Sequence, residues 1–119
     1  MRLEKLQETM EEQYRRCEDV LLKKSREYTG GSDEKLEHFR AAAALMGVTA
    51  EAALMGMLSK HLVSVADMCM DQRGSAAYSI DQWEEKITDS MNYLFLLKAI
   101  IREDNPTWDE VEQEADNEA

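Results

Sequence analysis

The sequence predicts an all-α fold, an antiparallel four-helix bundle with a short C-terminal helix or acidic tail. Helix breakers are scarce in its 119 residues, which include one proline, Pro106, and five glycines. Apolar residues recur at helical spacing in four segments, and short polar stretches separate these segments. The length suits a single helical-bundle domain over 1–103, followed by an acidic tail over 104–119.

The first two predicted helices end at glycines. A helix over about 2–28 carries one apolar row, which we expect to face the bundle: Leu3, Leu6, Met10, Tyr14, Cys17, Leu21 and Tyr28. It stops at Gly30 and Gly31, and a second helix follows and ends before Gly47. The alanines of 41–44 in this second helix let a neighbouring helix approach closely.

The third and fourth predicted helices begin at capping residues. Thr49 caps a helix over about 50–71, and Ser79 caps a helix over about 80–103. The stretch 71–78 between them lacks a hydrophobic period, so we expect a loop there.

The helix over 80–103 is apolar almost all round in its second half. Its main row, expected to face the bundle, is Ile80, Trp83, Ile87, Met91, Leu94, Leu97 and Ile101. Its reverse face begins with Glu85 and Asp89 and continues to Leu96 and Ile100. Such a helix must be covered on both sides, and in a small protein another subunit supplies the second cover. We therefore expect a homo-oligomer, a dimer or larger.

Charge is concentrated at the C-terminal end. The net charge is −11, and residues 103–119 hold eight acidic residues and no basic one. A last short helix is expected from Thr107 to Val111, before the acidic end. Because no basic stripe exists to hold a phosphate backbone, we expect no direct binding to nucleic acid.

Composition favours a cytoplasmic protein. No apolar run approaches the ~20 residues needed to span a bilayer, so no membrane partner is expected. The N-terminal segment is charged throughout, unlike a signal peptide. Cys17 and Cys69 both lie on apolar helix faces, which favours buried free thiols over a disulfide.

Acidic residues on the fourth helix form a candidate cation site. Glu85 and Asp89 are four residues apart, so both carboxylates lie on one face and can bind one hard cation such as Mg²⁺. The alternative is a surface ladder in which both acids pair with lysines. These two interpretations stay open.

The third helix carries a polar stripe and a histidine. Lys60, Ser64 and Asp67 lie close together around this helix, where Lys60 would hold a phosphate or pair with Asp89. The alternative for the stripe is a solvated edge. His61 lies within the apolar face, so it is either hydrogen-bonded in the core or lines a pocket.

A family pattern runs through residues 20–103. It consists of Lys24-x-x-x-Tyr28 with Gly30, then Phe39, then Lys60-His61, then Glu85-Lys86-x-x-Asp89-x-x-Asn92-Tyr93. The pattern resembles small helical proteins of phages and prophages, and it is similar to distant members of the MazG-like all-α nucleotide pyrophosphohydrolases. The resemblance implies a nucleoside triphosphate held through Mg²⁺, an oligomeric assembly and, for a phage protein, the host cytoplasm.

The resemblance also implies site residues. The residues expected to bind the ligand are Lys60, His61, Ser64, Asn92 and Tyr93, and those expected to hold Mg²⁺ are Glu85, Asp89 and Asp67. Glu85 and Asp89 are near the family's Glu-x-x-Asp motif, with a spacing of four rather than three. The stretch 59–67 of the third helix holds one acid, Asp67, where the family has several.

Two functions follow from these patterns. The first is a nucleotide-binding protein related to MazG-like pyrophosphohydrolases, which would be a Mg²⁺-dependent nucleoside triphosphate pyrophosphohydrolase if it hydrolyses its ligand. The shortage of acids on the third helix favours binding without efficient hydrolysis. The alternative is a non-enzymatic phage inhibitor that acts on a host defence protein by protein–protein contact.

Overall fold

The predicted all-α fold is confirmed. The computed structural model describes residues 1–29 and 36–110, and the side chains of 1–23 and 36–110. Within these residues there are four α-helices and no strand. The helices are α1 (Leu3–Thr29), α2 (Glu37–Met46), α3 (Ala50–Met70) and α4 (Ile80–Asp104), with a 3₁₀ turn at Ser75–Ala77. The predicted end of the first helix at Gly30 and Gly31 lies outside the described residues, as does the acidic end over 111–119.

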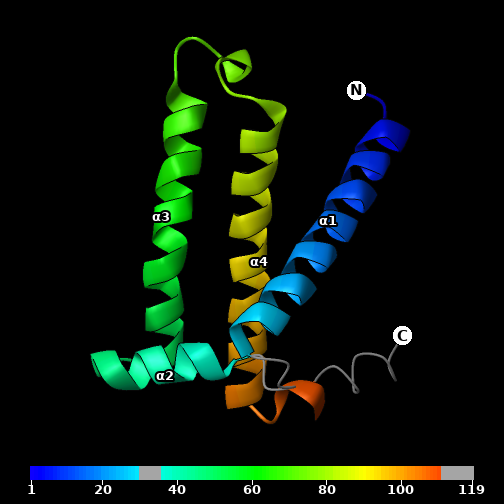
Figure 1. Ribbon diagram of the computed structural model, residues 1–119. Coiled ribbons are helices and arrows are strands. Elements are labelled where there is room, and N and C mark those ends of the chain that lie inside the picture. Colours follow the sequence, from blue (N-terminus) through cyan, green and yellow to red (C-terminus); the bar gives the residue numbers. More distant parts are fainter. Residues whose placement is uncertain (30–35, 111–119) are drawn as a thin grey trace.

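The long helices α3 and α4 form an antiparallel hairpin, and α2 lies across the end of this hairpin (Figure 1). The bend between α2 and α3 measures 99°. It occurs at Gly47, whose φ of 68° is left-handed and strained for other residues. The C-terminal half of α1 packs on α4, and the N-terminal part of α1 diverges from α4 (Figure 1).

Capping residues begin α3 and α4 as predicted. The Thr49 hydroxyl accepts the Ala52 N–H at 3.2 Å. The Ser79 hydroxyl accepts the Gln82 N–H at 3.1 Å, and the Gln82 side chain accepts the Ser79 N–H at 2.9 Å. This reciprocal capping box satisfies two backbone donors that the first turn of α4 leaves free.

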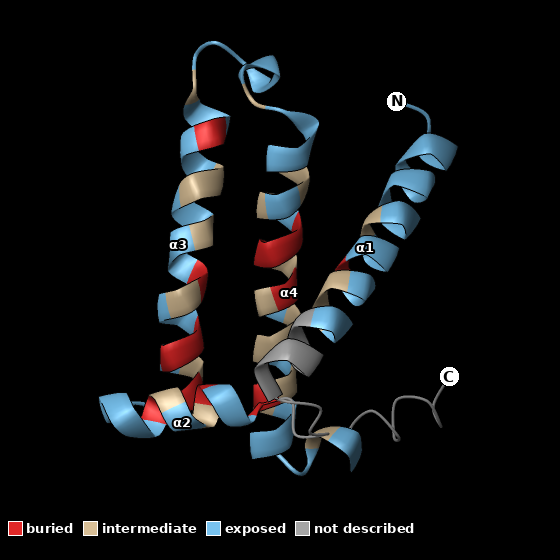
Figure 2. Ribbon diagram, in the orientation of Figure 1, coloured by how far each residue is buried: buried red, intermediate tan, exposed pale blue. Residues whose placement is uncertain are grey.

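The apolar core lies where α2, α3 and α4 meet (Figure 2). Leu54, Leu58 and Ile100 are almost completely buried there, beside Phe39. Ala43, Ala50 and Ala53 are buried in the same cluster, so the small side chains let α2 lie close against the hairpin. The core is therefore concentrated at one end of the molecule.

Two expectations about buried faces are wrong. On α4, Ile80, Ile87 and Leu94 are 79%, 39% and 51% exposed, although their row was expected to face the bundle. On α1, Leu3, Leu6 and Met10 of the expected core row are exposed, because α1 diverges from α4 there. Tyr14 is also exposed, although its ring packs edge-on against Phe95 of α4. Hydrophobic periodicity shows which side of a helix is apolar, but not which element covers that side.

Both described cysteines are free thiols, as expected, but they differ in burial. Cys17 is buried where α1 meets α4, and its sulfur lies 4.0 Å from that of Met91. Cys69 is exposed near the end of α3, which corrects the expectation that both are buried. Among the described residues no single helix is long and apolar enough to cross a bilayer; only α2 and α3 taken together pass that test, across their bend.

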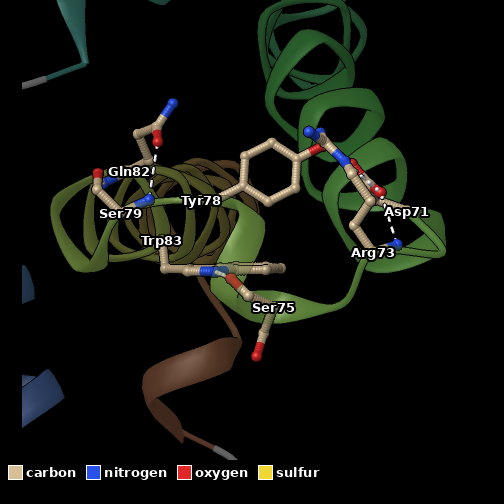
Figure 3. A network of polar contacts seen from close by, with 7 residues as sticks. All are labelled: Asp71, Arg73, Ser75, Tyr78, Ser79, Gln82 and Trp83. Atoms are coloured by element: carbon tan, nitrogen blue, oxygen red, sulfur yellow. Dashed lines mark hydrogen bonds and ion pairs between the residues drawn. The ribbon is translucent and has the colours of Figure 1, made fainter.

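The loop between α3 and α4 is built around one carboxylate (Figure 3). Asp71 accepts hydrogen bonds from the Arg73 guanidinium at 2.8 and 3.1 Å, from the Arg73 backbone N–H at 3.0 Å and from the Tyr78 hydroxyl at 2.7 Å. The Trp83 indole donates to the Ser75 carbonyl at 2.9 Å and packs edge-on against Tyr78. The predicted loop is thus tied to the first turn of α4.

The C-terminal end of α4 is tied to α2 by ion pairs. The Arg40 guanidinium lies 2.9 Å from carboxylate oxygens of both Glu103 and Asp104. The hydrogen bonds that Arg40 donates to Asp104, and then to Glu103, raise the pKa of Arg40. Residues 108–110 are helical, as predicted for the last short helix, and Lys98 lies over the Trp108 ring at 5.7 Å.

Replacing Leu54 by alanine tests the position of the core. We expect Leu54→Ala to lower the free energy of unfolding by about 2–5 kcal/mol, because the site cannot collapse fully around the cavity. Leu45→Ala is the matched control, since Leu45 is 89% exposed. Urea denaturation followed by circular dichroism measures both variants, and equal losses would contradict this assignment of the core.

The Asp71 network predicts a pH-dependent contribution to stability. The Arg73 hydrogen bonds, with that of Tyr78, hold the pKa of Asp71 well below its usual range. A carboxyl group whose pKa is lower in the folded state stabilises the fold above its unfolded pKa of ~3.9 and loses that effect as pH falls further. We expect Asp71→Asn to lower the melting temperature at pH 7, and the gap from the wild type to narrow below about pH 4.

The control for this experiment is Asp19→Asn, which removes an exposed carboxylate from α1. It changes the net charge equally and is expected to leave the melting temperature nearly unchanged. An equal loss in both variants, or a gap for Asp71→Asn that does not narrow on acidification, would contradict the role of Asp71.

Candidate functional site

Buried polar residues occupy the middle of α4. Thr88, Asp89, Ser90 and Asn92 are all buried, on a stretch where a core helix ordinarily carries apolar side chains. A buried polar group is costly unless a hydrogen-bond partner or a ligand compensates for the lost water. The centre of α4 is therefore the candidate functional site.

The side of this cluster that faces α1 is satisfied by a glutamine. The Gln13 side-chain amide donates to the Thr88 hydroxyl at 2.9 Å and lies 3.3 Å from the Cys17 sulfur. One turn away, Arg16 forms an ion pair with Glu84. Sequence reasoning missed Gln13 and Thr88. The available signal was a polar residue, Gln13, at helical spacing between Met10 and Cys17 of an apolar row.

The side that faces α3 is formed by a histidine and a tyrosine. His61 Nδ1 lies 3.9 Å from an Asp89 carboxylate oxygen, too far for a direct hydrogen bond. The His61 ring packs against the Tyr93 ring with centroids 5.1 Å apart, and Tyr93 in turn contacts Phe39 at 6.4 Å. His61 Nδ1 is buried and forms no hydrogen bond. The structure thus brings together His61, Asp89 and Tyr93, three of the residues that were named for the site from the sequence.

Asn92 is the clearest unsatisfied group in the cluster. It lies one turn after Asp89 and is 6% exposed. Its amide nitrogen and its amide oxygen are both buried without a hydrogen-bond partner. In native proteins the great majority of buried polar atoms form hydrogen bonds. An asparagine whose amide nitrogen and oxygen both lack a partner is therefore expected to form hydrogen bonds with a ligand or with water.

A pocket of ≈ 350 Å³ opens between α1 and α4 beside this cluster. Its lining residues are Arg16, Val20, Asp81, Glu84, Glu85, Thr88 and Asp89. Four carboxylates and one guanidinium give the pocket a negative character, which favours a cation or a cationic group. Its volume is at the lower end of the range for small-ligand sites.

The predicted site residues lie on one side of the α3–α4 hairpin. Each helix has a line of contact with the other, marked by His61 on α3 and by Tyr93 on α4. At 3.6 residues per turn, Lys60, Ser64 and Asp67 lie on one flank of the α3 line. The corresponding flank of the α4 line carries Glu85, Asp89 and Asn92. In an antiparallel pair, residues that are rotated in the same direction from each helix's contact line lie on the same side of the pair. Both sets therefore face the same side of the hairpin.

Residues within this group differ in what they can offer. Lys60 is exposed, and its ammonium group is at the surface of this side. The Ser64 hydroxyl donates to the Lys60 carbonyl of its own helix at 3.1 Å. Asp67 is exposed and is not among the residues that line the pocket.

The proposed metal ligands are only partly assembled. Glu85 and Asp89 both line the pocket, so these two carboxylates can share one cation. Within residues 1–29 and 36–110, no group of three or more histidine, cysteine, aspartate or glutamate side chains is placed to hold a metal ion. The assignment of Mg²⁺ to Glu85, Asp89 and Asp67 stays a prediction.

Comparison with known proteins does not assign a family. No family model, no curated protein and no solved structure matches the chain. The resemblance to MazG-like proteins therefore stays an expectation, and the function is argued from the geometry of α4.

Replacing Asn92 tests whether its amide is unsatisfied. We expect Asn92→Leu to raise the free energy of unfolding by about 1–3 kcal/mol, because an apolar side chain with the same branching removes two buried polar atoms without partners. The comparison is Asn105→Leu at the C-cap of the same helix, where the side chain donates to the Ile101 carbonyl at 2.7 Å. That variant should lose stability. If Asn92→Leu is also destabilised in urea unfolding, the amide has a partner in solution.

Proposed function

We propose that the protein binds a nucleotide or nucleotide-like ligand on the polar side of the α3–α4 hairpin, without efficient hydrolysis. The observation that carries this proposal is Asn92, which is buried with a free donor and a free acceptor. The unbonded Nδ1 of His61 supports it from α3. A ligand that bonds these atoms recovers the free energy that their burial costs.

The chemistry of the side chains fits the parts of a nucleotide. An asparagine amide offers two donors and an acceptor in one plane, which match the hydrogen-bonding edge of a nucleobase or a sugar hydroxyl. Tyr93, the next residue in the chain, and His61 of α3 add two aromatic rings that pack against each other. Lys60 provides an exposed ammonium group on the same side, suited to a phosphate.

Glu85 and Asp89 fit a magnesium ion that arrives with phosphates. Mg²⁺ is commonly held by one or two carboxylates together with substrate phosphates and water. When bound, the ion would offset negative charge between the acidic pocket and the phosphates. Although four carboxylates line the pocket, no three of the described acidic side chains are placed to share one ion, which falls short of the larger acidic set that the resemblance implies for hydrolysis. Binding without efficient turnover follows from this shortage.

A second function, contact with a partner protein, is favoured by the exposed row on α1. Leu3, Leu6, Met10 and Tyr14 lie along one side of α1 and are all exposed. Apolar residues in line on a protruding helix are typical of a surface that binds another protein. An inhibitor that acts on a host protein by contact would use such a surface.

Thermal shift with a panel of nucleoside triphosphates and Mg²⁺ tests the first proposal. We expect at least one nucleotide to raise the melting temperature, because a ligand at 100 times its Kd adds about 2.7 kcal/mol to stability. Asn92→Leu and Lys60→Ala should reduce this shift, and Lys23→Ala, on the exposed side of α1, should preserve it. Assays for pyrophosphate and phosphate in the same samples should show little product.

The outcomes separate the candidate functions. Rapid release of pyrophosphate would show a pyrophosphohydrolase and contradict binding without turnover. The absence of both shift and product across the panel would remove the nucleotide proposals and leave contact with a partner protein. A shift that all three variants retain would place the ligand elsewhere on the molecule.

A further inference from the structure

Two apolar rows run along the side of the α3–α4 hairpin opposite the polar one. On α3 the row is Met55, Leu62 and Cys69, and on α4 it is Ile80, Ile87 and Leu94. All six residues are exposed. Both rows have a spacing of seven residues, which is the spacing of helices that pack lengthwise against other helices.

The two rows lie side by side on the hairpin. On each helix, the row lies roughly a quarter turn around the helix axis from the line of contact with the neighbouring helix. The direction of this rotation is the same on α3 and on α4. Because α3 and α4 are antiparallel (Figure 1), an approximate twofold axis perpendicular to the plane of the hairpin relates them. Such an axis preserves the two sides of the hairpin, so both rows belong to one apolar side.

We infer that this apolar side is the surface through which two copies of the chain form a dimer. One third of all residues are charged and the net charge is −11, yet neither row contains a charged residue. By the same helical spacing this side also carries one residue of each sign, Glu51 and Lys98, so the side has no net charge, and two acidic chains repel each other least through such a side. Between the rows and the contact line, Ser90 is buried and half-buried Leu97 adds apolar surface.

The shape of the side also suits a second copy. A hairpin of two antiparallel helices has its own approximate twofold symmetry, so it is complementary to an identical hairpin that faces it. Two such hairpins placed face to face form a four-helix arrangement in which all four rows are covered. A closed twofold dimer results, rather than an open chain of subunits.

The dimer leaves the candidate ligand site open. Lys60, Asp89 and Asn92 lie on the opposite side of the hairpin from the two rows, so each copy retains its own polar side. The inference about the dimer therefore does not depend on the proposed nucleotide binding, and either one can fail alone.

Light scattering after size-exclusion chromatography tests the inference. We expect the wild type to have twice the chain mass of 13.7 kDa. Leu62→Glu and Ile87→Glu should each weaken the dimer by at least about 100-fold, because each places a charge in the centre of the covered side. Lys60→Glu is the matched control, since it adds a glutamate to the polar side of the same helix and should leave the dimer intact.

Circular dichroism of each variant shows whether the helices remain folded. If a glutamate variant unfolds, Leu94→Gln and Leu62→Gln replace it, and these should weaken the dimer by a smaller factor. A wild type that stays monomeric over a 100-fold range of protein concentration would overturn the inference. So would a dimer that both glutamate variants retain, which would place the contact on another surface such as the exposed row of α1.

Discussion

The packing of α4 between α1 and α3 is the constraint on which the rest of the structure depends. Toward its C-terminal end, Ile100 joins Leu54 and Leu58 in an apolar core that α2 covers. In its middle, α4 instead contacts α1 through the Gln13–Thr88 hydrogen bond and contacts α3 through the rings of His61 and Tyr93. The apolar core holds α3 against α4, and the adjacent polar stretch is buried because α1 and α3 both pack on the middle of α4.

This arrangement has a cost that stability alone does not explain. Leucine at position 92 would fill the same space without two buried, unbonded amide atoms. A sequence optimised only to fold would place an apolar residue there, as it does at Ile100 on the same helix. Departures from good packing in real proteins tend to occur at functional sites, where a ligand completes the missing interactions. The position of Asn92 beside Asp89 and His61 is consistent with this rule.

Local signals predicted the helices well, and long-range contacts limited the prediction of their faces. Thr49 and Ser79 act within three residues of themselves, so the starts of α3 and α4 could be read from the chain. The row of Ile80, Ile87 and Leu94 was recognised as apolar, but its exposure depends on where α1 and α3 pack. The Gln13–Thr88 bond joins residues 75 positions apart, and nothing near either residue indicates the partner. His61 and Asp89 were both named as site residues from the sequence, but the partner considered for Asp89 was Lys60, and the proximity of Asp89 to His61 was not predicted.

The two sides of the α3–α4 hairpin differ in polarity, and this difference needs a physical reason. If a hairpin is exposed on both sides in a monomer, selection for solubility makes both sides polar. Here one side carries Lys60, Glu85 and Asp67, whereas the other carries two uncharged rows. Such a difference is expected when one side stays in water and the other is covered. In a twofold dimer formed through the apolar rows, the charged side of each copy points outward. Electrostatic repulsion between the two acidic chains is therefore smallest in that geometry. The same geometry places the two polar sides on opposite outer surfaces of the dimer, where a ligand can reach each without disturbing the contact.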